Sequence, residues 1–155
     1  MIRLALAFLG CVAVACTSLS PFARECAETP TISRIVAGQT LWGKADGDVL
    51  LEPFRDVHGD RVLIAAAPEK MRIVVEHPII PTTDAERIPS TLDVVGRNTQ
   101  TGTSKTFQVS RHDSELGIGV EWGTNFEFPD AGCWELRVSP PRNAPATIVV
   151  RVVRS

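Results

Sequence analysis

The sequence predicts an all-β fold, and within that class an antiparallel β-sandwich. Short runs rich in β-branched and other apolar residues recur along the chain, separated by Gly, Pro, Asp and Asn. No stretch of useful length shows the period of an amphipathic helix. Several short strands with turn signals at this spacing are typical of two packed sheets, and 155 residues suit a single domain.

The predicted strands are Ile32–Ala37, Asp48–Phe54, Arg61–Ala67, Met71–His77, Thr91–Gly96, Lys105–Ser110, Val120–Phe128, Trp134–Ser139 and Thr147–Val153. In the segment from 120 to 128, larger residues alternate with Glu121, Gly123, Asn125 and Glu127, which is the period of a half-buried strand. The segment from 134 to 139 alternates in the same way. The last segment is apolar on both faces, which favours a central or doubly covered position.

Residues 1–15, MIRLALAFLGCVAVA, predict a signal peptide. Arg3 supplies a positive charge, and the apolar run Leu4–Ala15 is shorter than the about 20 residues that span a bilayer. Cleavage after Ala13-Val14-Ala15 by an ordinary signal peptidase would release a soluble protein. The same residues followed by Cys16 resemble a bacterial lipobox, in which Cys16 is acylated and becomes the new N-terminus. We expect lipidation at Cys16, with soluble export as the alternative.

Residues 16–30 have little periodicity and predict a tether, so that residues 31–155 form the domain. The cysteines fit an exported protein. Cys11 lies inside the signal peptide and Cys16 is the expected lipid carrier, which leaves Cys26 and Cys133 as an even pair. We predict a disulfide between them, with a buried free thiol as the alternative. In the chain-entropy model, closing so long a loop contributes about 4–5 kcal/mol.

The segment DAGCW, Asp130–Trp134, resembles the D-x-G/A-x-Y pattern that opens strand F of immunoglobulin-like domains. Trp134 takes the place of the aromatic residue that packs into the corner between strands E and F. Leu136 stands where the second Cys of that family lies. Since Cys133 falls on the opposite face from these two residues, a bond to Cys26 is predicted to staple the N-terminal segment across an outer face or a sheet edge.

The C-terminal part also resembles a group of uncharacterised bacterial secreted proteins and putative lipoproteins. The matching segments are LDVVGRNTQTG (Leu92–Gly102), FEFPDAGCWELRV (Phe126–Val138, with the core FP-x-x-GCWEL) and the tail TIVVRVV, within roughly the last sixty residues. The resemblance implies an immunoglobulin-like sandwich behind a signal peptide or a lipid anchor. It implies no activity.

Two polar clusters contain residue types that occur at functional sites. In DVHGD, Asp56, His58 and Asp60 alternate and would offer oxygen and imidazole ligands to a divalent metal from one side of the chain. The interpretation we favour is a hairpin tip, because Asp and Gly are turn formers.

The second cluster is RHDSE, Arg111–Glu115. It brings His112, Asp113 and Ser114 together, the residue types of a hydrolytic triad. Triad members meet in space and rarely as sequence neighbours, so we expect a solvated loop. Trp42 would form part of an aromatic binding surface or plug one end of the sandwich, and we favour the plug.

The composition argues against several function classes. A net charge of −2 gives no basic field for nucleic acid. There is no G-x-S-x-G elbow or phosphate-binding glycine loop, and neither His nor Met follows Cys133 as a blue-copper site requires. We expect a non-enzymatic binding or accessory module of the bacterial envelope, lipid-anchored or secreted.

We expect this module to have no cofactor and to have an envelope protein as its partner. A soluble extracytoplasmic carrier of a metal or a small molecule is the first alternative, and a hydrolase is the second. Domains of this kind usually bind through loops at one end or by strand pairing at an exposed edge.

Overall fold

The computed structural model describes residues 26–36, 39–56, 59–76, 88–112 and 120–155. Every regular element in these ranges is a strand, so the all-β prediction is confirmed. The strands are β1 Thr31–Val36, β2 Gln39–Asp46, β3 Val49–Glu52, β4 Arg55–Asp56, β5 Gly59–Asp60, β6 Leu63–Ile64, β7 Pro68–Val75, β8 Thr91–Asn98, β9 Ser104–His112, β10 Val120–Glu127, β11 Gly132–Val138 and β12 Ala146–Val153. None of these ranges contains a helix that could span a membrane.

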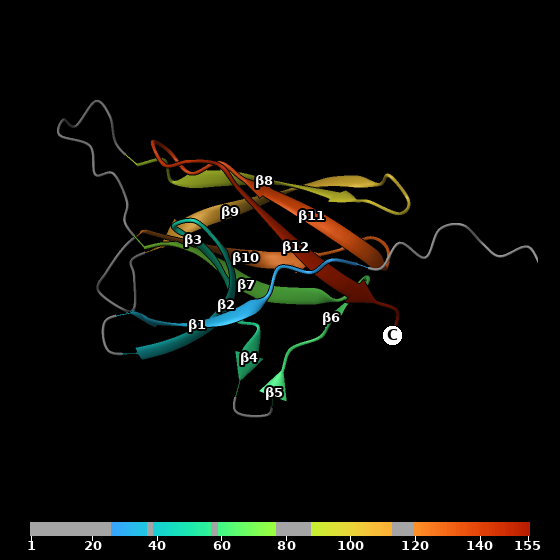
Figure 1. Cartoon of the computed structure of the whole chain (residues 1–155). Helices are drawn as coiled ribbons and strands as arrows, with labels where there is room; N and C mark the ends of the chain where they lie inside the picture. Colours follow the sequence, from blue (N-terminus) through green and yellow to red (C-terminus); the bar gives the residue numbers. More distant parts are fainter. Residues whose placement is uncertain (1–25, 37–38, 57–58, 77–87, 113–119) are drawn as a thin grey trace, which may run out of the picture.

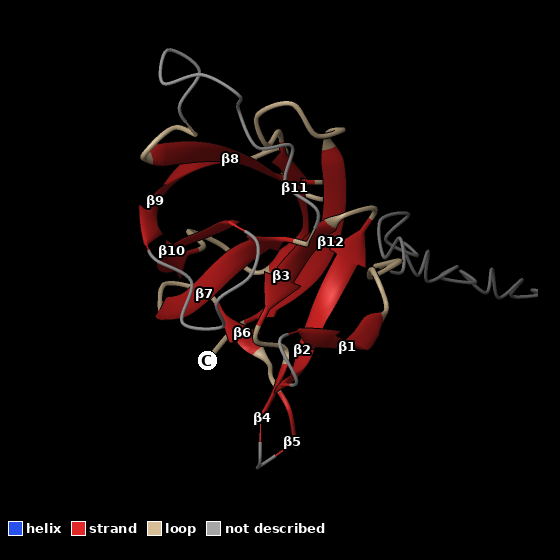
Figure 2. Cartoon of the chain, turned by 90° about the vertical axis from the view of Figure 1, so that its left-hand side faces the viewer, coloured by secondary structure: helices blue, strands red, loops and turns tan. Residues whose placement is uncertain are grey.

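Ten of the strands form one mixed sheet, in the order β1-β2-β3-β7-β10-β9-β8-β11-β12-β6, and β4 pairs with β5 alone. The pairing is antiparallel except between β6 and β12. The sheet curls, so that β8 and β11 lie opposite β3 and β7 (Figure 2). The backbone N–H of Thr147 on β12 donates to a carboxylate oxygen of Asp46 on β2 at 2.7 Å. Strands far apart in the sheet order therefore meet.

The interior of the curled sheet is filled by the alternating apolar residues. Trp122, Phe126, Phe128 and Trp134 are each at most 1% exposed. The Phe128 ring lies 5.3 Å from Trp134 and 5.2 Å from Phe107, measured between ring centroids. Burial of an aromatic side chain contributes about 1.5–3 kcal/mol. The predicted alternation is confirmed in the second half of β11, and in β10 for Trp122 and Phe126, whereas Glu121, at a position predicted to be exposed, is buried.

The strand β2 is missing from the sequence-based prediction. Its apolar residues do not alternate cleanly, because Gly43 and Lys44 interrupt them. A Cβ at Gly43 would lie 2.6 Å from Leu50 Cδ1, so a larger residue would collide with the neighbouring strand. On the outer face of the sheet, Leu41 of β2 packs with Leu50 and Val74 in a small second core. The β1–β2 hairpin thereby covers part of β3 and β7.

The predicted disulfide between Cys26 and Cys133 is present, with a sequence separation of 107. Cys26 belongs to a segment that runs beside β12 (Figure 1). Here the Thr29 N–H donates to the Val149 carbonyl at 3.0 Å, and the Val149 N–H donates to Thr29 Oγ1 at 2.8 Å. Trp134, next to Cys133, points into the core. The bond thus staples the N-terminal segment to the outside of the sheet, as predicted.

A buried polar corner joins the turn between β8 and β9 to the turn before β11. Asn98, which is 0% exposed, donates from Nδ2 to Asp130 Oδ1 at 3.1 Å and to the Ala131 carbonyl at 3.0 Å. Thr101 and Thr103 donate to Asp130 Oδ2 at 2.9 and 2.8 Å. Asn98 and Thr101 lie in the segment Leu92–Gly102, and Asp130 lies in Phe126–Val138, two segments that carry the resemblance described above. Their contacts give both segments a structural role.

This corner makes stability depend on pH. Partial burial raises the pKa of Asp130. Hydrogen bonds from Thr103, Thr101 and Asn98 lower it by more than burial raises it, so that the pKa lies below 3.8. A lowered pKa means that the ionised carboxylate contributes its full stability above about pH 4 and loses it as the pH falls through the folded-state value.

We therefore expect Asp130→Asn to lower the free energy of unfolding at pH 7 by about 1–2 kcal/mol, with a smaller difference from the wild type below pH 3.8. Urea titrations of both proteins across this range test the expectation. A difference that stays constant from pH 7 to pH 3 would mean that ionisation of Asp130 is not what stabilises the corner.

Candidate functional site

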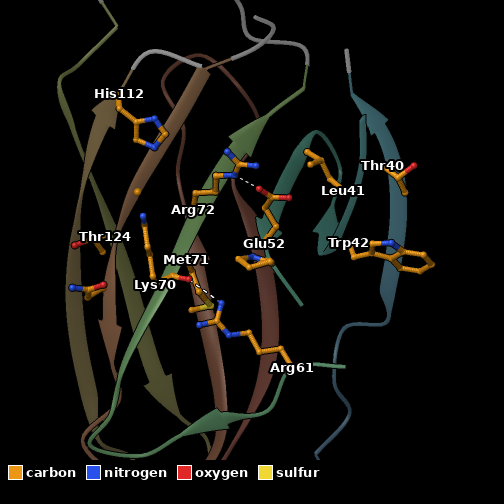
Figure 3. A pocket seen from close by; sticks show the side chains of 13 residues that line it. Thr40, Leu41, Trp42, Glu52, Arg61, Lys70, Met71, Arg72, His112 and Thr124 are labelled. Carbon is orange, nitrogen blue, oxygen red and sulfur yellow. Dashed lines mark hydrogen bonds and ion pairs between the residues drawn. The ribbon is translucent and has the colours of Figure 1, made fainter. Parts of the chain in front are cut away.

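An open groove with a volume of about 920 Å³ crosses the outer face of the sheet. It lies over β7 and β10, between β2 on one side and the end of β9 on the other (Figure 3). Its lining residues are Thr40, Leu41, Trp42, Glu52, Pro53, Arg61, Lys70, Met71, Arg72, His112, Gly123, Thr124 and Asn125. A groove of this size suits a small molecule or a short stretch of peptide.

A charged cluster forms the floor of the groove. Strand alternation sends Glu52, Arg72 and Glu121 from three neighbouring strands to the outer face of the sheet. Arg72 Nε donates to Glu52 Oε1, and Arg72 Nη1 lies 3.3 Å from Glu121 Oε2. Glu121 is 0% exposed and Glu52 is 3% exposed. Two nearly inaccessible carboxylates therefore hold the guanidinium of Arg72 in place.

His112 stands at the far end of this cluster. Its Nδ1 lies 3.8 Å from Glu121 Oε2, and its side chain is 43% exposed. Gly123 of β10 gives the imidazole room, because a Cβ there would lie 3.0 Å from His112 Nε2. We therefore expect a larger residue at position 123 to push His112 away from Glu121.

A second ion pair closes the other end of the groove. Arg61 Nη2 donates to Glu69 Oε2 at 2.7 Å, and Arg61 Nη1 donates to the Lys70 carbonyl at 2.9 Å. The other carboxylate oxygen of Glu69 accepts a hydrogen bond from the Ile64 N–H at 3.3 Å. Arg61 is thus anchored to β7. Its charged head still borders the open space of the groove.

The structure bears only in part on the predicted metal ligands. His58 lies outside the described residues, as do the side chains of Asp56 and Asp60. The backbone of β4 and β5 pairs with Asp56 opposite Gly59, which confirms the hairpin. In the described part of the chain, no group of three or more His, Cys, Asp or Glu side chains is placed to hold a metal ion.

The prediction of a solvated loop at Arg111–Glu115 is wrong for its first two residues. Arg111 and His112 continue β9, because the strand extends past its apolar core positions to pair with β10 at Trp122 and Glu121. Asp113, Ser114 and the following residues up to 119 lie outside the described ranges. The structure pairs His112 with the Glu121 carboxylate and does not test the triad interpretation.

The prediction that Trp42 plugs one end of the fold is also wrong. Trp42 is partly exposed, and it does not belong to either buried core. It lies on the unpredicted strand β2, at the border of the groove, and its indole points away from Arg72 (Figure 3). The alternative interpretation, in which Trp42 forms part of an aromatic binding surface, is not tested by the structure.

Cys16 lies outside the described residues, so the structure leaves its predicted lipidation untested. The chain matches no protein-family model, no curated protein and no solved structure.

Proposed function

We propose that this chain is an exported, non-enzymatic binding module of the bacterial envelope, and that the groove over β7 and β10 is its binding site. The observation that carries the proposal is the charged floor of the groove. A sheet face with no function is usually covered by solvated side chains, whereas here Glu52 and Glu121 are buried and fixed around Arg72. Burial of charged groups is costly, so a buried ion-pair cluster on the floor of an open groove supports a binding role for that groove.

A fragment screen followed by ¹H–¹⁵N NMR tests the groove. We expect fragments that bind to shift the backbone amides of Lys70, Thr124 and Asn125, which line it, more than any other set of amides. A matched control is Asn125→Trp. Asn125 is exposed and shares the outer face of β10 with Glu121 and Gly123, so the indole would occupy the groove and should abolish these shifts. Fragments that bind equally well to this variant would place the binding site elsewhere.

The proposal includes an immunoglobulin-like arrangement of the strands. It is supported by the indole of Trp134, which donates from Nε1 to the Asp130 carbonyl at 3.0 Å, four residues upstream. In immunoglobulin-like domains, the corner tyrosine makes a comparable bond back to the backbone.

The proposal also includes export, with a lipid at Cys16 as the anchor. The Cys26–Cys133 disulfide supports it, because disulfides persist mainly outside the reducing cytosol. The test is the intact mass of the mature protein, expressed in a bacterial host with its own leader.

A chain that starts at Cys16 and carries a diacylglyceryl-sized increment is the expected result. A plain mass that starts at or near Cys16 would make the protein a soluble export. A mass that includes residues 1–15 would contradict export.

A further inference from the structure

We propose that the groove recognises a small organic anion, a carboxylate with a short apolar body. This inference rests on the proposed function, because it assumes that the groove is the binding site. Three observations carry it: the sign of the charge that faces the open space, the position of Lys70, and the apolar wall that faces Lys70.

The accessible charge of the groove is positive. In each ion pair at its floor and end, the cation is more exposed than the carboxylate. The Arg72 side chain is 23% exposed, against 3% for Glu52 and 0% for Glu121. Arg61 is 25% exposed, against 11% for its partner Glu69. A ligand that enters the groove therefore meets the cations first, although the chain as a whole has a net charge of −2.

Lys70 adds a further cation to the lining of the groove. It is exposed, and none of the ion pairs among the described residues includes its ammonium group. Its side chain runs along the groove, between Arg72 and Thr124 (Figure 3). Lys70 and Arg72 stand two positions apart on the same face of β7, and both line the groove. An anion would interact favourably with both groups.

The geometry favours a single carboxylate over a phosphate. Arg72 already uses Nε and Nη1 to hold Glu52 and Glu121. It therefore has no pair of adjacent N–H groups left for the bidentate contact by which arginine recognises phosphate. Lys70 contributes a point charge. Leu41 lies across the groove from Lys70 (Figure 3) and offers an apolar wall, which fits the body of a short aliphatic acid.

The test compares three probes of equal length, namely hexanoate, 1-hexanol and hexylammonium, by ¹H–¹⁵N NMR titration of the full domain. We expect hexanoate to shift the amides of Lys70, Thr124 and Asn125, and the two other probes to bind more weakly at the same site. Lys70→Met should weaken the binding of hexanoate about five- to tenfold. Arg137→Met removes an exposed cation on β11, outside the groove, and should leave the binding unchanged.

Each other outcome is informative. If the three probes bind alike and Lys70→Met has no effect, the groove binds apolar ligands and the anion proposal is overturned, while the proposed function stands. If hexylammonium binds best, the buried carboxylates make the groove prefer a positively charged ligand, and the anion proposal is again overturned. If no amide of the groove shifts with any probe, both proposals fail.

Discussion

Replacing Arg72 by methionine is expected to destabilise the domain by about 3 kcal/mol, because two buried carboxylates would lose their cation. Glu121 is 0% exposed and Glu52 is 3% exposed, and both contact the guanidinium of Arg72. Methionine retains much of the apolar stem, so the loss of charge dominates the effect. Urea denaturation of the variant at pH 7 gives the free energy of unfolding.

The control for this prediction is the triple variant Arg72→Met, Glu52→Gln and Glu121→Gln. It has no unpaired charge at the floor of the groove, so it should recover a large part of the lost stability. A single Arg72→Met variant as stable as the wild type would show that the cluster contributes no net electrostatic stability. A triple variant no more stable than the single one would assign the loss to packing and hydrogen bonding.

The double variant Cys26→Ala, Cys133→Ala is expected to lose about 4 kcal/mol, within the range for native disulfides. The bond closes a loop between residues 107 positions apart, and the constraint on the unfolded chain grows with loop length. Alanine at position 133 remains compatible with a site that is only 6% exposed. Denaturation of the variant, and of the wild type with and without a reductant, measures the effect.

Hydrogen exchange shows whether the bond also holds the N-terminal segment in place. The amides of Thr29 and Val149 make the two hydrogen bonds between that segment and β12. In the double variant we expect both amides to exchange faster, whereas the Leu136 amide in the core should follow global unfolding. Unchanged protection at Thr29 would mean that its hydrogen bonds and the ion pair between Glu28 and Arg151 suffice to hold the segment.

The features that the sequence predicts correctly depend on local pattern. Alternation in β10 and β11 identifies Trp122, Phe126 and Trp134 as core residues without knowledge of their partners. The disulfide follows from the cysteine count, because only Cys26 and Cys133 remain once Cys11 in the predicted signal peptide and Cys16, the predicted lipid carrier, are set aside. In both cases the relevant information lies in a few adjacent positions or in a simple count.

The site depends on contacts that no local pattern reveals. Glu121 occupies a polar position of an alternating strand, which predicts exposure, yet it is completely buried. Its burial depends on Arg72, 49 positions earlier in the chain. Similarly, β2 is held by its pairing with β1 and β3 and by the packing of Leu41 on Leu50 and Val74. Its Lys44 also donates to the Thr29 carbonyl at 2.6 Å. None of these contacts is visible in the sequence QTLWGKAD.

The attachment of the N-terminal segment to the last strand has a kinetic consequence. Val149 hydrogen-bonds a residue 120 positions earlier, and Asp46 accepts from Thr147 across 101 positions. Contacts between residues so far apart in the sequence form slowly, because the chain loses the entropy of closing the loop before the contacts contribute any stability. The N-terminal segment therefore docks late in folding. Until it docks, Cys26 and Cys133 remain thiols that can react with an oxidant or form a disulfide with another cysteine. Conditions that slow folding should therefore also lower the yield of the correct disulfide.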